Sequence, residues 1–430
     1  MFKKKLLSCI LVGLFMVVVT GSFLSVQALG QKKEPIRIGA VLTLSSIIPL
    51  INQEQKRGFE VAVDKVGGEI QGRPIELYFA DVSSLESAKS EALRLIQLKG
   101  CKVIIGSGID DFDGAMSSIC ERNKVIFWMT LAGGPILTKP GQKYTFRTNP
   151  WSTLEGTAQA DWFVNYILPL LGIERSKVRA AVLHLDSAWG TQMSSELVRC
   201  LEEKDIKVVF NKAYSEETTR TMAPVVLKIK SLGANVFFAP GMFPKGARLF
   251  WEAAKTLDFN PLVAIGTGGF LGTGYAKDVL GNLVNGFCST NWPVENTNPK
   301  LSPGMQEFVQ MYKKKYGEEH LRTCHSASAY TGMLFLLDAL KRAKNLDDVD
   351  SIVEAIRKTD IPPRKIGNGW GCKFAGPDEW NNGTNLRAFE VGVQWQDGQM
   401  WTIYPMPYPG RKLELPMLSW KDKEKIYQKK

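Results

Sequence analysis

Residues 36–44 read Ile-Arg-Ile-Gly-Ala-Val-Leu-Thr-Leu. The run is almost continuously apolar and is followed by small polar residues, a pattern typical of a strand buried on both faces of a parallel sheet. The next stretch carries apolar residues at helical spacing on one face, namely Phe59, Ala62, Val63 and Val66. Residues 75–80 then form a second apolar run. This order predicts a strand, a helix and a second parallel strand.

The same alternation continues along the chain in two series. The first adds strands at residues 103–105 and 125–129, and helices from Leu85 and from about Asp111 to Asn123. The second has strands at 179–185, 208–210, 235–239 and 262–265, with helices starting near Thr191, Thr221, Lys245 and Thr273. About 400 residues exceed what one hydrophobic core supports, so two α/β lobes with doubly wound parallel sheets are expected. Residues 386–404 are predicted to form a β-hairpin around Asp397-Gly398.

The first 28 residues have the layout of a secretory signal peptide. Three lysines precede an uncharged run from Leu6 to Leu24, and Val26-Gln27-Ala28 offers small residues for cleavage. A retained membrane anchor is the alternative. Removing the leader lowers the net charge from +11 to +8, since it holds three lysines and no acid. The remaining positive charge is dispersed and is not interleaved with aromatic residues, which predicts no nucleic-acid partner.

The sequence lacks the residue patterns that several kinds of site require. Export permits disulfides between the six cysteines beyond the leader, but their spacing selects no pairing. The chain has three histidines and no CxxC or HxxxH pattern, so no metal site is expected. The glycine-rich segment 266–274 has the wrong spacing for a dinucleotide loop, so no cofactor is expected. The absence of GxSxG and HExxH patterns argues against an enzyme.

Candidate ligand-binding residues follow the ends of the predicted strands, where ligands of open parallel sheets bind. Ser46 follows the first strand. Asp110 and Asp111 begin a predicted helix, where they would either cap it or face a ligand. Trp189 follows a strand of the second series, and its ring would either stack on a ligand or pack on the lobe. Tyr330 opens an apolar helix and fits a pocket or a core equally well.

The chain resembles the solute-binding proteins of branched-chain amino-acid-type ABC importers. The matching segments occur in the family's order along nearly the whole chain: residues 36–42, 58–64, 72–77 with Asp81, 103–106, 146–148, Ala329-Tyr330 and 393–398. The resemblance implies a type I periplasmic-binding-protein fold, in which two lobes close around a ligand about a three-stranded hinge. By analogy lobe 1 comprises residues 34–149 and 291–385, and lobe 2 comprises residues 150–290 and 386–430.

The resemblance also implies a set of pocket positions. The main-chain groups that hold a ligand carboxylate fall on Leu131 and Gly133. The second-lobe aromatic residue falls near Met242, and the acid that pairs with a ligand amino group falls on Gly268, which has no side chain. An unpaired buried ammonium costs several kcal/mol, and Asp110 would repel a carboxylate. Branched-chain amino acids are therefore not the expected ligands, and an amide, a urea-like compound, an amine or an aromatic compound fits as well.

These observations predict a monomeric, periplasmic or extracytoplasmic protein that delivers a small polar or aromatic molecule to ABC permease subunits. The alternative is a ligand sensor of the same fold that signals to a membrane receptor. Neighbouring permease and ATPase genes would favour the first hypothesis, and a neighbouring histidine kinase gene would favour the second. An enzyme is the third possibility, and the missing catalytic constellation argues against it.

Overall fold

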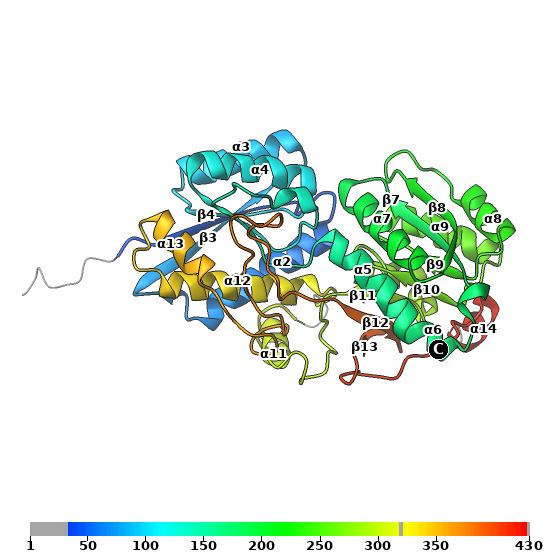
Figure 1. The fold of residues 1–430 in the computed structure, drawn as a ribbon. Helices are drawn as coiled ribbons and strands as arrows, with labels where there is room; N and C mark the ends of the chain where they lie inside the picture. Colours follow the sequence, from blue (N-terminus) through cyan, green and yellow to red (C-terminus); the bar gives the residue numbers. More distant parts are fainter. Residues whose placement is uncertain (1–32, 318–320, 428–430) are drawn as a thin grey trace, which may run out of the picture.

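The computed structural model describes residues 33–317 and 321–427. The predicted signal peptide, residues 1–28, lies outside the described residues. The described strands form two sheets, each covered by helices on both faces, and the two bodies lie side by side (Figure 1). The expected α/β class is confirmed.

The sheet of lobe 1 is built from the first part of the chain. Its strands lie in the order β2 (Glu69–Ile70), β3 (Arg73–Asp81), β1 (Ile36–Leu42), β4 (Val103–Ile105), β5 (Ile126–Met129) and β6 (Thr145–Arg147). All pairs are parallel except β2 with β3. β1 lies between β3 and β4, with Ile38 paired to both Leu77 and Val103, which explains its continuous apolar run.

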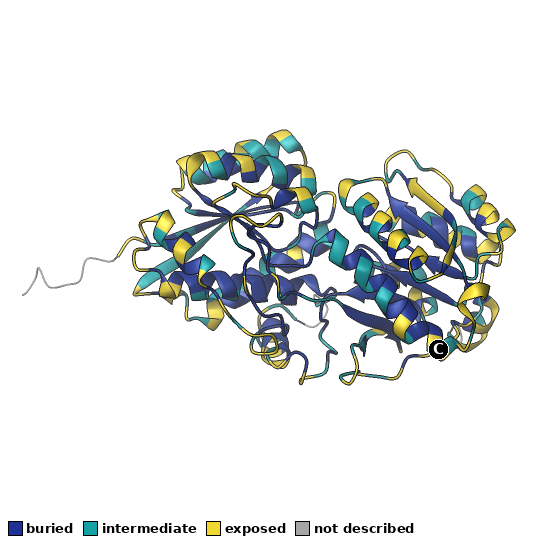
Figure 2. Cartoon of the chain, in the orientation of Figure 1, coloured by how far each residue is buried: buried dark blue, intermediate teal, exposed yellow. Residues whose placement is uncertain are grey.

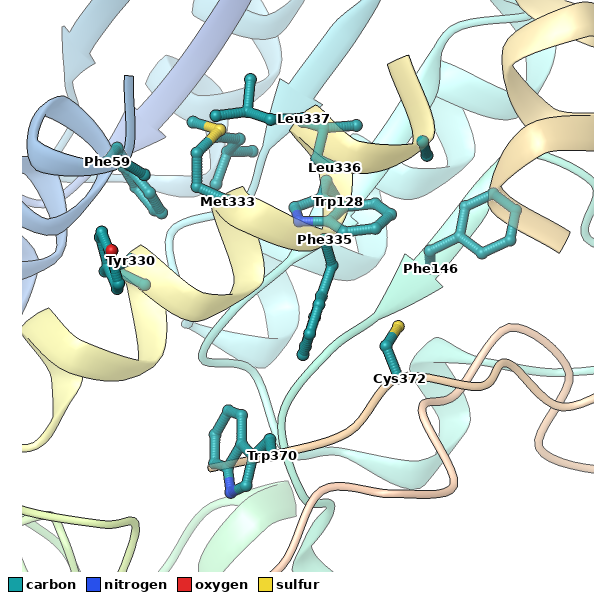
Figure 3. Packing of buried hydrophobic residues seen from close by; sticks show 14 of the residues in the cluster. Phe59, Trp128, Phe146, Tyr330, Met333, Phe335, Leu336, Leu337, Trp370 and Cys372 are labelled. Atoms are coloured by element: carbon teal, nitrogen blue, oxygen red, sulfur yellow. The ribbon is translucent and has the colours of Figure 1, made fainter. Parts of the chain in front are cut away.

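Alternate residues of these strands pack on opposite faces of the sheet. Ile104 and Phe127 join the cluster beneath α3 (Leu85–Gln97) and α4 (Asp110–Asn123). Ile105 and Trp128 join a larger cluster on the other face (Figure 3). The helices of that face come from two distant segments of chain: α2 (Pro49–Lys65), α11 (Met305–Tyr316), α12 (His325–Arg342) and α13 (Val349–Arg357).

The sheet of lobe 2 follows the same plan. Its strands lie in the order β13 (Gln399–Tyr404), β12 (Val391–Gln396), β11 (Cys288–Asn291), β10 (Val263–Gly266), β9 (Val236–Phe238), β7 (Arg179–Leu185) and β8 (Lys207–Tyr214). Its helices are α5 (Ser152–Trp162), α6 (Leu168–Leu171), α7 (Ala188–Glu202), α8 (Ala223–Ser231), α9 (Pro244–Thr256), α10 (Gly274–Leu280) and α14 (Trp420–Tyr427). The strands of both sheets are largely buried, whereas the outer helix faces are exposed (Figure 2).

The chain passes between the two sheets three times. It leaves lobe 1 after β6 at Arg147, returns after β11 at Asn291, and enters lobe 2 again before β12 at Val391. Asn385 fastens the last passage to the first, because its backbone N–H donates to Arg147 O (2.8 Å) and its Nδ2 donates to Thr148 O (3.0 Å). These three adjacent connecting segments form the hinge between the lobes.

Two details of the sheets differ from the sequence prediction. The sheets are mixed rather than wholly parallel, because β12 pairs antiparallel with both β11 and β13. The predicted hairpin is present, and its turn residues Asp397 and Gly398 have positive φ angles of 52° and 70°, as a tight hairpin turn requires. Its first strand begins at Val391 rather than at residue 386.

The described residues contain no disulfide, and the six cysteines among them are buried and free. Across residues 33–317 and 321–427, no group of acids, histidines and cysteines is arranged to hold a metal ion. In the same ranges no helix is long and apolar enough to cross a membrane.

Candidate functional site

A cavity of about 280 Å³ lies between the lobes, at the ends of the strands and beside the hinge. Lobe 1 contributes Ile47, Ile48, Ile51, Gly108, Ile109, Asp110, Asp111, Leu131 and Gly133. Lobe 2 contributes Glu155, Leu185, Asp186, Ser187, Ala188, Trp189, Phe243, Thr267, Gly268 and Gly269. The hinge and the start of α12 add Thr290, Asn291, Trp292, His325 and Glu390. A cavity of this size fits a small molecule.

Asp110 enters the cavity because another acid closes the turn before its helix. Asp113 accepts hydrogen bonds from Ser107 N (2.8 Å), Ser107 Oγ (2.9 Å) and Gly108 N. The residue before the helix, Ile109, makes no side-chain cap. Asp110 is thus not needed as a cap, and its Oδ1 accepts from Gly134 N (3.1 Å). Its Oδ2 is buried and has no hydrogen-bond partner among the described residues.

Two further acids reach the cavity from lobe 2 and the hinge. Glu155 lies in the first turn of α5 and accepts a hydrogen bond from Trp189 Nε1 (2.6 Å). Ser152 N donates to Gly133 O (3.0 Å) and so joins the start of α5 to lobe 1. Glu390 lies directly before β12, and its Oε1 is buried without a partner among the described residues.

The three acids share one electrostatic environment. Burial raises the pKa of Asp110, Glu155 and Glu390. Repulsion from Asp110 raises the pKa of Glu155 further, and repulsion from Glu155 does the same to Glu390. The Arg147 guanidinium opposes this effect at Asp110 and Glu155, and its own burial lowers its pKa to about 10. Burial also lowers the pKa of His325 to about 3, so this imidazole is neutral near pH 7.

Trp189 spans the gap between the lobes. A Cβ atom added at Gly133 of lobe 1 would lie 2.8 Å from Trp189 Cδ1. Added at Gly241 of lobe 2, it would lie 3.1 Å from Trp189 Cζ3. The Phe243 ring lies 6.2 Å from the Trp189 ring, centroid to centroid. The indole is therefore held between glycines, with its N–H fixed by Glu155 and its rings forming an apolar wall.

Comparison with protein families places this arrangement in a known group. The family described as periplasmic binding protein matches residues 35–379. The chain belongs to this family. Leu/Ile/Val-binding protein homolog 8 of Brucella abortus is 30% identical over 402 residues, 93% of this chain and 96% of the relative. Leu/Ile/Val-binding protein homolog 7 of Brucella suis is 30% identical over 400 residues, 91% of this chain and 98% of the relative.

Solved structures of similar proteins confirm the expected type I fold. The leucine-binding protein LivK of Thermotoga maritima has a TM-score of 0.72 at 21% identity, over 85% of this chain and 97% of its own. The isoleucine complex of LivJ from Streptococcus pneumoniae has a TM-score of 0.72 at 17% identity, over 89% and 100%. A solute-binding protein from R. palustris in complex with benzoate has a TM-score of 0.71 at 17% identity, over 90% and 97%.

In this periplasmic binding protein, six of the nine positions predicted from the sequence line the cavity: Asp110, Asp111, Leu131, Gly133, Trp189 and Gly268. The carbonyl oxygens of Leu131 and Gly133 accept hydrogen bonds from Asn149 Nδ2 and Ser152 N within the chain. A Cβ added at Gly268 would lie 3.3 Å from Asn291 Oδ1, so this position faces the hinge side of the cavity.

The other three predicted positions do not line the cavity. Ser46 Oγ donates to Val82 O (2.9 Å) and closes the loop after β1. Met242 is buried in the core of lobe 2. Tyr330 packs in the core of lobe 1 (Figure 3), with its ring 4.8 Å from that of Phe308. Both core residues pack within apolar clusters.

Several lining residues were not predicted from the sequence. Glu155 looks like an ordinary acid in a first helical turn, and Glu390 precedes a strand on the far side of a chain crossing. His325 begins α12, one position after a cysteine that gives no binding signal. Ile47 has a positive φ of 44°, a strained conformation for a β-branched residue, and remains 47% exposed beside the cavity. No local pattern would have marked these four residues.

Proposed function

We propose that this periplasmic binding protein is the solute-binding component of an ABC importer and traps a small molecule between its lobes. The supporting observation is that one cavity is lined by residues of lobe 1, lobe 2 and the hinge together. A ligand there would contact both lobes only in the closed arrangement, so its binding energy favours closure. The protein would act without catalysis, as a monomer that is exported through a cleaved signal peptide and presents its ligand to permease subunits.

The ligand of this protein would differ from those bound in two of its structural neighbours. These neighbours are complexes with isoleucine and with benzoate, both of which carry a carboxylate. Here Asp110 already occupies the Gly134 N–H with its own carboxyl group. Gly268 offers no acid to an amino group at its position. Asp110 would therefore repel the carboxylate of a branched-chain amino acid, and position 268 would offer no acid to its amino group.

The proposal is tested by combining a thermal-shift screen with small-angle X-ray scattering of the exported protein. The screen covers amides, amines and aromatic compounds together with leucine, isoleucine and valine. A compound present at 100 times its Kd should stabilise the fold by about 2.7 kcal/mol. The same compound should reduce the radius of gyration as the lobes close. Strong stabilisation by leucine, isoleucine and valine would contradict the proposed ligand class, and binding without compaction would contradict the closure mechanism.

A further inference from the structure

The charges around the cavity are all of one sign. Five carboxyl groups line it: Asp110, Asp111, Glu155, Asp186 and Glu390. The described lining residues include no lysine and no arginine, and the one imidazole, that of His325, is neutral because of its burial. The cavity therefore has a strongly negative potential when its acids are ionised.

Two of these acids each present an oxygen with nothing bound to it. Asp110 Oδ2 and Glu390 Oε1 are buried and have no hydrogen-bond partner among the described residues. The acids reach the cavity from separate elements, Asp110 from the start of α4 and Glu390 from the segment before β12. A buried acceptor without a donor destabilises the fold, and it does so more strongly if it is charged. Such oxygens are expected where a ligand supplies the missing donor.

Arg147 is a buried cation that interacts with Asp110 and Glu155, but its single charge does not balance the negative charge of the site. Its guanidinium donates to Gly134 O from behind the cavity wall, and its Nε has no partner among the described residues. One guanidinium cannot neutralise Asp110, Glu155 and Glu390 together. Some of these carboxyl groups therefore keep their protons, in line with the raised pKa of each.

We infer that the cleft binds a cationic group, an ammonium or amidinium, which is carried by a small apolar body and held by Asp110 and Glu390 with Glu155 beside them. This inference rests on the proposed function of the cleft as a solute site. Apolar side chains surround the acids, and the walls suited to the ligand body include Ile48, Leu131, Trp189, Phe243 and Trp292. Aromatic faces attract cations in addition to covering the body. A ligand whose only charge is a carboxylate would be rejected by the same acids.

Matched probes separate charge from shape. Benzylamine, benzyl alcohol and benzoate share one ring and differ in the charge of the substituent, and 3-methylbutylamine makes the same comparison with leucine for an aliphatic body. By calorimetry, benzylamine should bind at least about tenfold tighter than benzyl alcohol, and benzoate should bind weakest. Binding of the amine should release protons, which is detected as a dependence of the heat on the buffer, because the cation favours ionised carboxyl groups.

Two variants and one control assign the effect to the cleft. Asp110→Asn and Glu390→Gln keep the side-chain shape and should each weaken amine binding by about tenfold or more, with less proton release. Glu86→Gln on α3, an exposed acid remote from the cavity lining, should leave it unchanged. Cooperative thermal unfolding of each variant shows that it is folded. Because the two substitutions lie on different elements, one variant still tests the inference if the other does not fold.

The outcomes also separate this inference from the proposed function. Equal affinity for amine, alcohol and carboxylate overturns the inference, as does the absence of binding by both amines up to about 10 mM. If leucine or benzoate binds and compacts the protein while the amines do not bind, the charge inference fails and the solute-trapping function stands. If the amines bind with proton release but the radius of gyration does not change, the charge inference stands and the closure mechanism fails.

Discussion

At the scale of single residues, the cleft depends on a close approach between a glycine and an indole. Gly133 lies against Trp189 without the clash that a larger residue would produce. Trp189 in turn donates a hydrogen bond to Glu155 of its own lobe (2.6 Å). The missing side chain of Gly133 is thus what allows the tryptophan of lobe 2 to close onto lobe 1.

We predict that Gly133→Ala weakens ligand binding by about tenfold or more, because its Cβ would lie 2.8 Å from Trp189 Cδ1 and would push the indole away from Glu155. The tryptophan fluorescence spectrum should shift at the same time. Gly114→Ala in α4 is the matched control, since its Cβ would meet only Leu137 at 3.5 Å. That change should stabilise the helix by about 0.5–1 kcal/mol and leave affinity intact. Unchanged affinity in Gly133→Ala would remove this contact from the binding mechanism.

At the scale of elements, α2 holds the loop before α12 through a buried acid. Glu54 accepts hydrogen bonds from Arg322 N (2.7 Å) and Thr323 N (3.0 Å). Burial raises the pKa of Glu54 to about 8 from its ordinary value of 4.5. The same loop contacts lobe 2, because Gly274 N donates to Arg322 O (2.9 Å). Glu54 thus holds the backbone of a loop that also contacts lobe 2.

The pKa of Glu54 makes a prediction with a definite sign. Because its folded pKa is raised, its stabilisation is complete below about pH 4.5 and is lost as the pH rises through about 8. Between about pH 5.5 and 7.5, the unfolding free energy of the wild type should fall by about 2 kcal/mol relative to Glu54→Gln. Urea denaturation of both proteins at the two pH values measures this difference. Glu86→Gln, which replaces an exposed acid, is the control. If the unfolding free energy of the wild type rose with pH relative to Glu54→Gln, the raised pKa of Glu54 would be disproved.

At the scale of the whole molecule, the lobes touch through a small set of contacts besides the cavity. Arg322 Nη2 contacts the Asp278 carboxylate (2.5 Å) across the gap, and Leu50 N donates to Tyr275 Oη (3.2 Å). The ion pair is partly exposed, with side-chain exposures of 34% and 53%. Such a pair contributes at most about 1 kcal/mol, so it biases closure without locking it.

We predict that Asp278→Asn shifts the ligand-free protein toward more open arrangements, because the variant loses its charge attraction to Arg322 in the closed arrangement only. Its radius of gyration should increase, and its affinity for the ligand should fall about two- to fivefold. The melting temperature should change little. Glu252→Gln removes an exposed ion pair with Arg248 inside α9 and should change neither quantity. An equal effect of both variants would mean that general charge, not the lobe contact, controls closure.

The fold could be predicted from the sequence because its signals are local. Apolar runs such as residues 36–42 predict buried parallel strands, and Asp397-Gly398 predicts its hairpin turn whatever the rest of the chain does. The order of motifs extended this to the family. The position of Asp110 and Trp189 after strand ends was likewise enough to bring both to the cavity. The strands and the turn are consequences of hydrophobic periodicity and turn chemistry alone, whereas the family follows from a resemblance.

The tertiary structure decided which side chains share the cleft. α12 is buried almost all round, so Tyr330 faces the core while His325, at the start of the same helix, faces the cavity. Glu155 and Glu390 join Asp110 only because the chain crosses the hinge three times. A periodic pattern records whether a residue is buried, but not which distant residue lies opposite it. The sequence thus determined a two-lobed binding protein, and only the packing of the lobes decided that its cleft is lined by acids.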